Sequence, residues 1–181
     1  MLLSRRILFV CLGNICRSPA AEGVLRGLAA KDPKAPILHI ESAGTSGMHT
    51  GDAPDPRMRR AAAKRGYALN SRARQFQAKD LEEFDLIIPM DQANLEAVLR
   101  LASRKEHRSK VVPMATYLTR HAHTSIPDPW YGGPEGFEEV LDLLEDACGN
   151  LLQLLTRQQG GGTRNSEGAP TNPSGPHTPA T

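Results

Sequence analysis

Residues 7–18, with the sequence ILFVCLGNICRS, place a strand, a loop and the start of a helix in one short stretch. The continuous apolar run Ile7–Val10 is typical of a parallel strand buried on both faces, and a helical pattern begins at Pro19. Cys11 ends the strand, and Arg17 follows it six residues later. Because a loop between a strand and a helix can turn its backbone N–H groups inward around an anion, this stretch predicts an α/β fold with an anion-binding loop.

Strand-like and helix-like segments alternate along the first 157 residues. Strands are expected at residues 7–10, 37–43, 85–90 and 111–114, and helices at 19–31, 56–65, 92–102 and 136–157. These four strands separated by helices predict a three-layer α/β fold, in which a four-stranded parallel sheet carries helices on both faces. Ligands of such sheets bind beyond the carboxyl ends of the strands, where Cys11 and residues 42–47 are expected to lie.

The length and composition fit one folded domain followed by a tail. The patterned part, residues 1–157, is long enough to bury a core. Residues 158–181 are rich in Gly, Pro, Ser and Thr without periodic apolar positions, so we expect this tail to be disordered. A formal net charge of +2 and an aromatic content of 4% give no basis for nucleic-acid binding. No apolar stretch reaches the roughly 18 residues that a membrane span needs, so no membrane partner is expected.

The cysteines indicate the compartment. Cys11, Cys16 and Cys148 are an odd and sparse set, unlike the disulfide framework of a secreted protein. Residues 1–6 place a basic pair after a very short apolar piece, which is the wrong order for a secretory signal. We therefore expect a cytoplasmic protein. The cysteine and histidine spacings match no zinc site, so no metal is expected.

The loop after the first strand has the groups that a phosphate dianion needs. Residues 12–17 can supply consecutive N–H donors, the following helix adds its positive end, and Arg17 can bind two phosphate oxygens at once. The same features favour the thiolate of Cys11 over the thiol, and Ser18 can add a hydrogen bond to the sulfur. A buried cysteine beside an unrelated surface arginine is the simpler alternative. The Gly-Asn filling of the loop and the Ser-Pro helix start disfavour it.

A general acid is the next requirement, because thiolate attack on phosphorus leaves an oxygen that must be protonated. Asp128 is the candidate, in the segment IPDPWYGG at residues 126–133. The prolines on both sides stiffen the segment, and Trp130 and Tyr131 can wall an aromatic cleft. Pro-Asp-Pro and Gly-Gly also form plain surface turns. Beside the cysteine loop, we favour Asp128 as the acid over a turn alone.

Over residues 5–157 the chain resembles the low-molecular-weight protein tyrosine phosphatase family. The resemblance is carried by VCLGNICRSP at residues 10–19, SAGTS at 42–46, Met90-Asp91 with Asn94, and DPWYG at 128–132. It implies a flavodoxin-like or Rossmann-like sheet of four parallel strands, and no cofactor or metal. It also implies a covalent cysteinyl-phosphate on Cys11, with Arg17 as phosphate clamp and Asp128 as acid and then as base. Phosphotyrosine proteins or small aryl phosphates are the implied substrates.

The resemblance extends to residues around these three. In the family, the equivalents of Asn14 and Ser42 brace the loop, and that of Ser18 stabilises the thiolate. Ile15 is more typical of the phosphotyrosine enzymes, since arginine phosphatases tend to have Thr at this position. The substrate-binding residues implied are Leu12, Gly13, Asn14, Ile15, Cys16, Ser18, Met48, Trp130 and Tyr131. Two positions depart from the family pattern: Met48 stands where Trp or Tyr is frequent, and Ser71 aligns with a bracing His of eukaryotic members.

Several other residues carry two interpretations. The resemblance implies that Cys16 can form a reversible disulfide with Cys11 that shields the nucleophile, and a passive loop residue is the alternative. Cys148 lies on the apolar stripe of the last helix and is expected to be core packing. Asp55 and Asp91 precede helices and are interpreted as caps, although the place of Asp91 after the third strand also puts it near the expected site.

Two other functions fit parts of the pattern. An arsenate reductase on the same scaffold would need further cysteines in the middle of the chain to relay a disulfide, and the sequence has none there. A phosphate-binding module without catalysis would not need the complete set of Cys11, Arg17 and Asp128. A cluster of basic residues is expected to be a solvated surface, with steering of phosphoproteins as the less favoured role. It comprises Arg57, Arg59, Arg60, Lys64, Arg65, Arg72 and Arg74.

Overall fold

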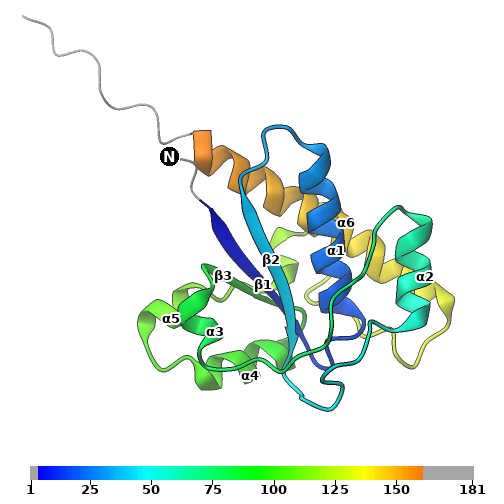
Figure 1. Ribbon diagram of the computed structural model, residues 1–181, viewed down its shortest axis with the longest axis horizontal. Coiled ribbons are helices and arrows are strands. Elements are labelled where there is room, and N and C mark those ends of the chain that lie inside the picture. Colours follow the sequence, from blue (N-terminus) through cyan, green and yellow to red (C-terminus); the bar gives the residue numbers. More distant parts are fainter. Residues whose placement is uncertain (1–3, 161–181) are drawn as a thin grey trace, which may run out of the picture.

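The computed structural model describes residues 4–160, and Figure 1 shows the strands at the centre with helices around them. In chain order the elements are β1 (Arg5–Cys11), α1 (Arg17–Lys31), β2 (Leu38–Gly44), α2 (Pro56–Lys64), α3 (Asp80–Glu83), β3 (Leu86–Pro89), α4 (Gln92–Leu101), α5 (Lys105–Ser109), the 3₁₀ helix η1 (Met114–Tyr117) and α6 (Pro134–Gly160).

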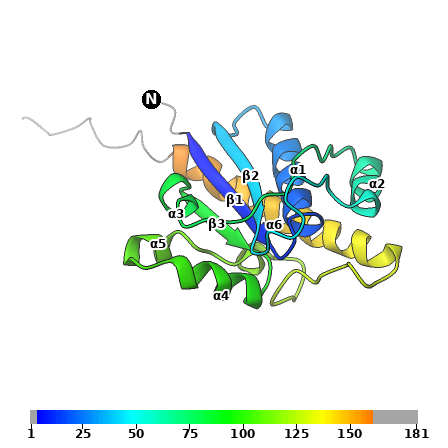
Figure 2. The ribbon, with the colours of Figure 1, turned by 60° about the horizontal axis from the view of Figure 1, so that its bottom comes forward.

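The sheet is parallel, with β1 in the middle and the order β2-β1-β3. Cys11 at the end of β1 pairs with Gly44 at the end of β2. All three strands therefore finish at one edge, which comes forward in Figure 2. This edge is where the sequence places the ligand.

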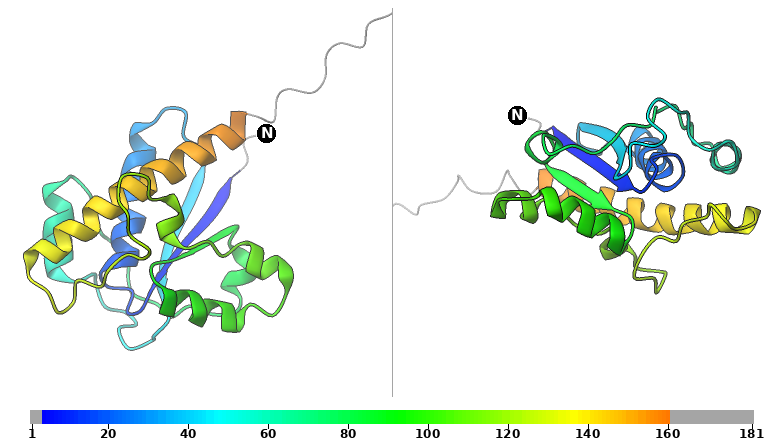
Figure 3. Two further views of the ribbon diagram at one scale, coloured as in Figure 1. Left: turned by 180° about the vertical axis from the view of Figure 1, so that it is seen from behind. Right: turned by 90° about the horizontal axis from the view of Figure 1, so that it is seen from below.

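The central strand is buried on both faces because helices cover the sheet from each side. Ile7 and Phe9 belong to a core with α1 and α6, and Leu8 and Val10 to a core with α3 and α4. Seen from behind, α6 crosses in front of the strands (Figure 3). α2 packs against α1 and α6. The predicted three-layer α/β arrangement is confirmed.

The predicted fourth strand is wrong, and among residues 4–160 the sheet has three strands. The segment around Val111 forms a single parallel bridge to Ile87. Ile87 donates its N–H to Lys110, and Val112 donates to the carbonyl of Ile87. The ladder ends there because Pro113 has no N–H to donate and precedes the 3₁₀ helix η1.

Local signals placed the predicted helices well. Asp55 accepts a hydrogen bond from the N–H of Arg57 and caps α2, and Gly66 beyond its end has a φ of 85°. The last helix extends to Gly160, past the predicted boundary at residue 157. The remainder of the predicted disordered tail, residues 161–181, lies outside the described residues. Within residues 4–160, no helix combines the length and apolar character that crossing a membrane requires.

Candidate active site

Cys11 lies at the floor of the loop that joins β1 to α1. Its side chain is buried, with only 2% of the residue exposed. The N–H of Asn14 donates to Sγ at 3.3 Å, and the hydroxyl of Ser18 lies 3.0 Å from it. The positive end of the 15-residue α1 starts just beyond the loop. Hydrogen bonds and a helix N-terminus directed at sulfur stabilise a thiolate.

Asn14 holds the loop in shape. Its φ of 57° is the only positive value among the described non-glycine residues, and asparagine tolerates this region better than most residues. The side-chain amide donates to the Ser18 hydroxyl at 2.9 Å and accepts from the N–H of Arg74 at 3.0 Å. Since the Ser18 oxygen accepts from Asn14, the Ser18 proton can point to the Cys11 sulfur at 3.0 Å or to the carbonyl of Ala43 at 3.4 Å. Asn14 therefore links the loop to a segment 60 residues away.

Ser42, which was expected to brace the loop, instead joins β2 to α1. Its hydroxyl donates to the buried carboxylate of Glu22 at 2.6 Å. Asn14 is braced by the backbone N–H of Arg74, three residues after Ser71, the position that aligns with the bracing His of eukaryotic members. Asp80 and Glu41 hold the Arg74 guanidinium, each at 3.1 Å. The sequence offered Arg74 as one of several surface arginines, and nothing local signalled this role.

Arg17 is almost completely buried, with 3% of its side chain exposed. One terminal nitrogen donates to Asp91 at 2.6 Å and to the carbonyl of Ile126 at 3.1 Å, and the other lies 3.2 Å from Asp128. Asp91 also caps α4 by accepting from the N–H of Asn94 at 2.8 Å. Asp91 was expected to be a cap, and it both caps α4 and orients Arg17.

Asp128 stands at the mouth of the site, with 42% of its side chain exposed. The preceding loop is fixed at the end next to Asp128, where Ile126 donates its N–H to the carbonyl of Met90 at 2.8 Å. At the other end of the loop, the buried carboxylate of Asp146 accepts from the N–H groups of Thr119 and Arg120. Although burial opposes ionisation, these bonds and one from His121 hold the pKa of Asp146 below its usual range. The loop therefore delivers Asp128 to Arg17 from two anchored ends.

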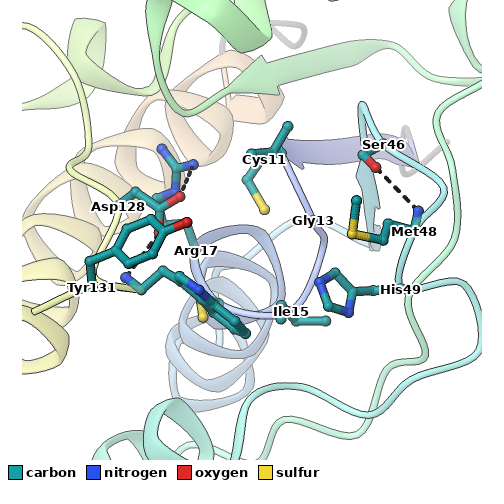
Figure 4. Close-up of a pocket in the computed structure, with 12 residues that line it drawn as sticks. Cys11, Gly13, Ile15, Arg17, Ser46, Met48, His49, Asp128 and Tyr131 are labelled. Atoms are coloured by element: carbon teal, nitrogen blue, oxygen red, sulfur yellow. Dashed lines mark hydrogen bonds and ion pairs between the residues drawn. The ribbon is translucent and has the colours of Figure 1, made fainter.

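A pocket of about 300 Å³ brings the predicted residues together. Figure 4 shows the Cys11 side chain pointing into it, with Asp128 and Tyr131 on one side and Met48 and His49 on the other. It is lined by Cys11, Leu12, Gly13, Ile15, Cys16, Arg17, Ser46, Met48, His49, Asp128, Trp130 and Tyr131. Asn14 and Ser18, expected to bind substrate, instead lie buried and outside this lining.

His49 is a pocket residue that the sequence did not reveal. Its ring approaches so closely that a Cβ at Gly13 would lie 3.1 Å from its Cδ2. This close approach leaves little room for a side chain at residue 13, which favours glycine there in addition to the tight turn. Nδ1 lies 3.1 Å from Asp52, and the ring centroid lies 6.0 Å from that of Trp130. The only available signal was its position next to Met48.

Cys16, the second cysteine of the loop, is a buried thiol. Burial, together with the negative charge of Asp55, raises the pKa of the Cys16 thiol to about 12. Cys16 therefore remains a thiol at neutral pH. Cys148 is fully buried, as expected of core packing.

We expect brief treatment with iodoacetate at pH 7 to label Cys11 and to leave Cys16 unmodified, because only a thiolate is alkylated rapidly. Peptide mass mapping measures the two sites separately. A Cys16→Ala control should react at the wild-type rate. Labelling of Cys16 at a rate comparable with that of Cys11 would contradict the raised pKa of the Cys16 thiol.

Comparisons with known proteins identify the family of this chain. The profile of the family described as low molecular weight phosphotyrosine protein phosphatase matches residues 6–160. The Synechocystis sp. protein slr0328, which carries the name of this family, is 47% identical over 84% of this chain and 98% of its own length. A crystal structure of a protein tyrosine phosphatase from Entamoeba histolytica, with Hepes in its active site, is 39% identical with a TM-score of 0.76, covering 87% and 99% of the two chains. The structure of the Drosophila arginine phosphatase DARP is 29% identical with a TM-score of 0.76, covering 82% and 96%. The family profile matches residues 6–160, and a relative that is 47% identical matches 84% of the chain. This chain therefore belongs to the low molecular weight phosphotyrosine protein phosphatase family.

Proposed function

We propose that this protein hydrolyses phosphotyrosine through a cysteinyl-phosphate intermediate, with Cys11 as nucleophile, Arg17 as phosphate clamp and Asp128 as general acid and base. The observation that carries the proposal is the meeting of the three side chains at one pocket. Cys11 lies at its floor, and the guanidinium of Arg17 lies 3.2 Å from Asp128 at its mouth. These are the three roles that phosphoryl transfer to a thiolate requires.

The first half of the reaction is transfer to sulfur. The Cys11 thiolate attacks phosphorus, the bond from phosphorus to the phenolic oxygen breaks, and Asp128 gives its proton to that oxygen. Arg17 binds two of the three remaining phosphoryl oxygens. Loop N–H groups bind the charge that develops on them. Because Asp91 and Ile126 already fix one nitrogen of Arg17, this clamp is oriented before substrate arrives.

The second half is hydrolysis. Asp128, now a carboxylate, takes a proton from water as that water attacks phosphorus. The sulfur–phosphorus bond breaks, Cys11 returns to the thiolate, and inorganic phosphate leaves. The partial exposure of Asp128 supports this step, because water can reach it after the phenol departs.

The walls of the pocket favour an aryl substrate. Leu12, Ile15, Trp130 and Tyr131 offer apolar and aromatic surface to a phenol ring. Ile15 supports phosphotyrosine over phosphoarginine, because the apolar side chain matches a ring better than a guanidinium. The odd and sparse set of three cysteines in the sequence supports a reducing, cytoplasmic location.

The direct test compares peptides that carry phosphotyrosine, phosphoserine or phosphoarginine, in the presence of EDTA. We expect phosphate release from the phosphotyrosine peptide to exceed release from the others, and EDTA to leave the rate unchanged. A preference for phosphoarginine, or activity that EDTA abolishes, would refute the proposal.

Replacing Asp128 by Asn is expected to lower kcat by about 10²- to 10⁴-fold for phenyl phosphate, whose leaving oxygen needs a proton. The loss should be much smaller for an electron-poor aryl phosphate that leaves as a phenolate. The measurement is kcat against leaving-group pKa for wild type and variant. Equal losses across the series would show that Asp128 has another role.

A further inference from the structure

A second pocket, of about 430 Å³, lies directly beside the active site. One wall is α2, and the other is the segment Gly132–Pro134 together with the start of α6. Gly132 follows Tyr131, which lines the active-site pocket. The same stretch of chain therefore separates the two pockets.

The wall formed by α2 is positively charged. Arg57, Arg60 and Lys64 recur at intervals of three and four residues, so they share one helix face. Arg60 and Lys64 are exposed and, among residues 4–160, form no ion pair within 4.0 Å. The acidic residue of the pocket, Glu138, is already held by Arg65 at 2.6 Å. Two cations are therefore available to a ligand.

Arg57 ties this wall to the active site. The guanidinium of Arg57 forms an ion pair with Asp55 at 2.9 Å and lies 5.3 Å from the ring centroid of Trp130. It also donates to the carbonyl of Trp130 at 3.3 Å. Cation–π and hydrogen-bond contacts of this kind fix the aromatic wall against α2. The chain from Trp130 to Pro134 thus lines the active-site pocket first and then the pocket that also contains Arg60 and Lys64.

We propose that Arg60 and Lys64 form a subsite for an acidic side chain, Asp or Glu, of a phosphotyrosine peptide bound in the active site. This inference rests on the proposed function and adds a substrate preference to it. An extended peptide advances about 3.3–3.6 Å per residue, so a side chain two or three residues from the phosphotyrosine lies about 7–11 Å along the chain. Carboxylates match these cations, and a preorganised basic surface also speeds the encounter.

The test uses two phosphotyrosine peptides that differ only in flanking residues, Glu in one and Gln in the other. We expect wild-type kcat/KM to favour the Glu peptide by about 3- to 10-fold at low salt, the range of one or two exposed ion pairs. The preference should decrease as salt rises. It should vanish in the double variant Arg60→Gln/Lys64→Gln, and Arg60→Glu/Lys64→Glu should instead favour a Lys-flanked peptide.

Arg59→Gln is the matched control, because Arg59 is an exposed cation on the same helix that does not line the pocket. It should keep the Glu preference. A preference that survives the double variant, or that Arg59→Gln reduces equally, overturns the subsite. Wild type and variants alike should hydrolyse a small aryl phosphate at the same rate. If they do while no Glu preference exists, only the subsite fails; if no aryl phosphate is hydrolysed, the proposed function fails with it.

Discussion

The Cys11→Ser variant is expected to lose turnover by about 10⁴-fold or more, the scale seen when a covalent nucleophile is removed. A serine hydroxyl at the floor of the loop stays protonated. The contacts from Asn14 and Ser18 that stabilise a thiolate cannot convert it into an alkoxide. The remaining groups, Arg17 and Asp128, would still bind phosphate. We therefore expect the variant to lose kcat while it retains phosphopeptide binding.

The intermediate can be trapped to test the same residue directly. A labelled aryl phosphate mixed with wild-type enzyme and quenched with acid should leave phosphate on the peptide that contains Cys11. Cys16→Ser is the matched control, since it removes a thiol five residues away that lines the same pocket. It should still form the adduct. Label on any other residue would contradict the assigned nucleophile.

Arg17→Lys is expected to lower kcat/KM by about 10²- to 10³-fold, the range measured when one preorganised donor to a developing anion is removed. The guanidinium meets Asp91, Ile126 and Asp128 through two nitrogens in fixed positions. A single ammonium cannot satisfy all three acceptors and also bind two phosphoryl oxygens. Because lysine keeps the positive charge, the loss of kcat/KM measures what the planar geometry of the guanidinium contributes.

The measurement is kcat/KM together with the inhibition constant of vanadate, which mimics the transferring phosphoryl group. In Arg17→Lys, kcat/KM should fall and the inhibition constant of vanadate should rise. The affinity for vanadate should fall by a larger factor than the affinity for inorganic phosphate. Arg100→Lys, an exposed position on α4, provides a control that should match wild type. Wild-type activity in Arg17→Lys would show that charge alone is sufficient at this position.

Patterns within a few residues predicted much of this protein. The strand Ile7–Val10, the loop after it and the helix that follows were readable because apolar runs and helix starts are local features. The caps Asp55 and Asp91 followed from the same local logic. The prediction of a fourth strand was wrong because Pro113 ends the hydrogen-bonded ladder after a single bridge.

The sequence by itself determined the parallel α/β framework, because strand, loop and helix signals act between near neighbours. It also predicted Cys11, Arg17 and Asp128 as members of one site, and all three line one pocket. Only the tertiary structure decided how they are held. The partners of Arg17 lie 74 to 111 residues away, and the brace on Asn14 comes from a backbone N–H that any residue has. Such contacts depend on which segments the folded sheet brings to one edge, so no local pattern encodes them.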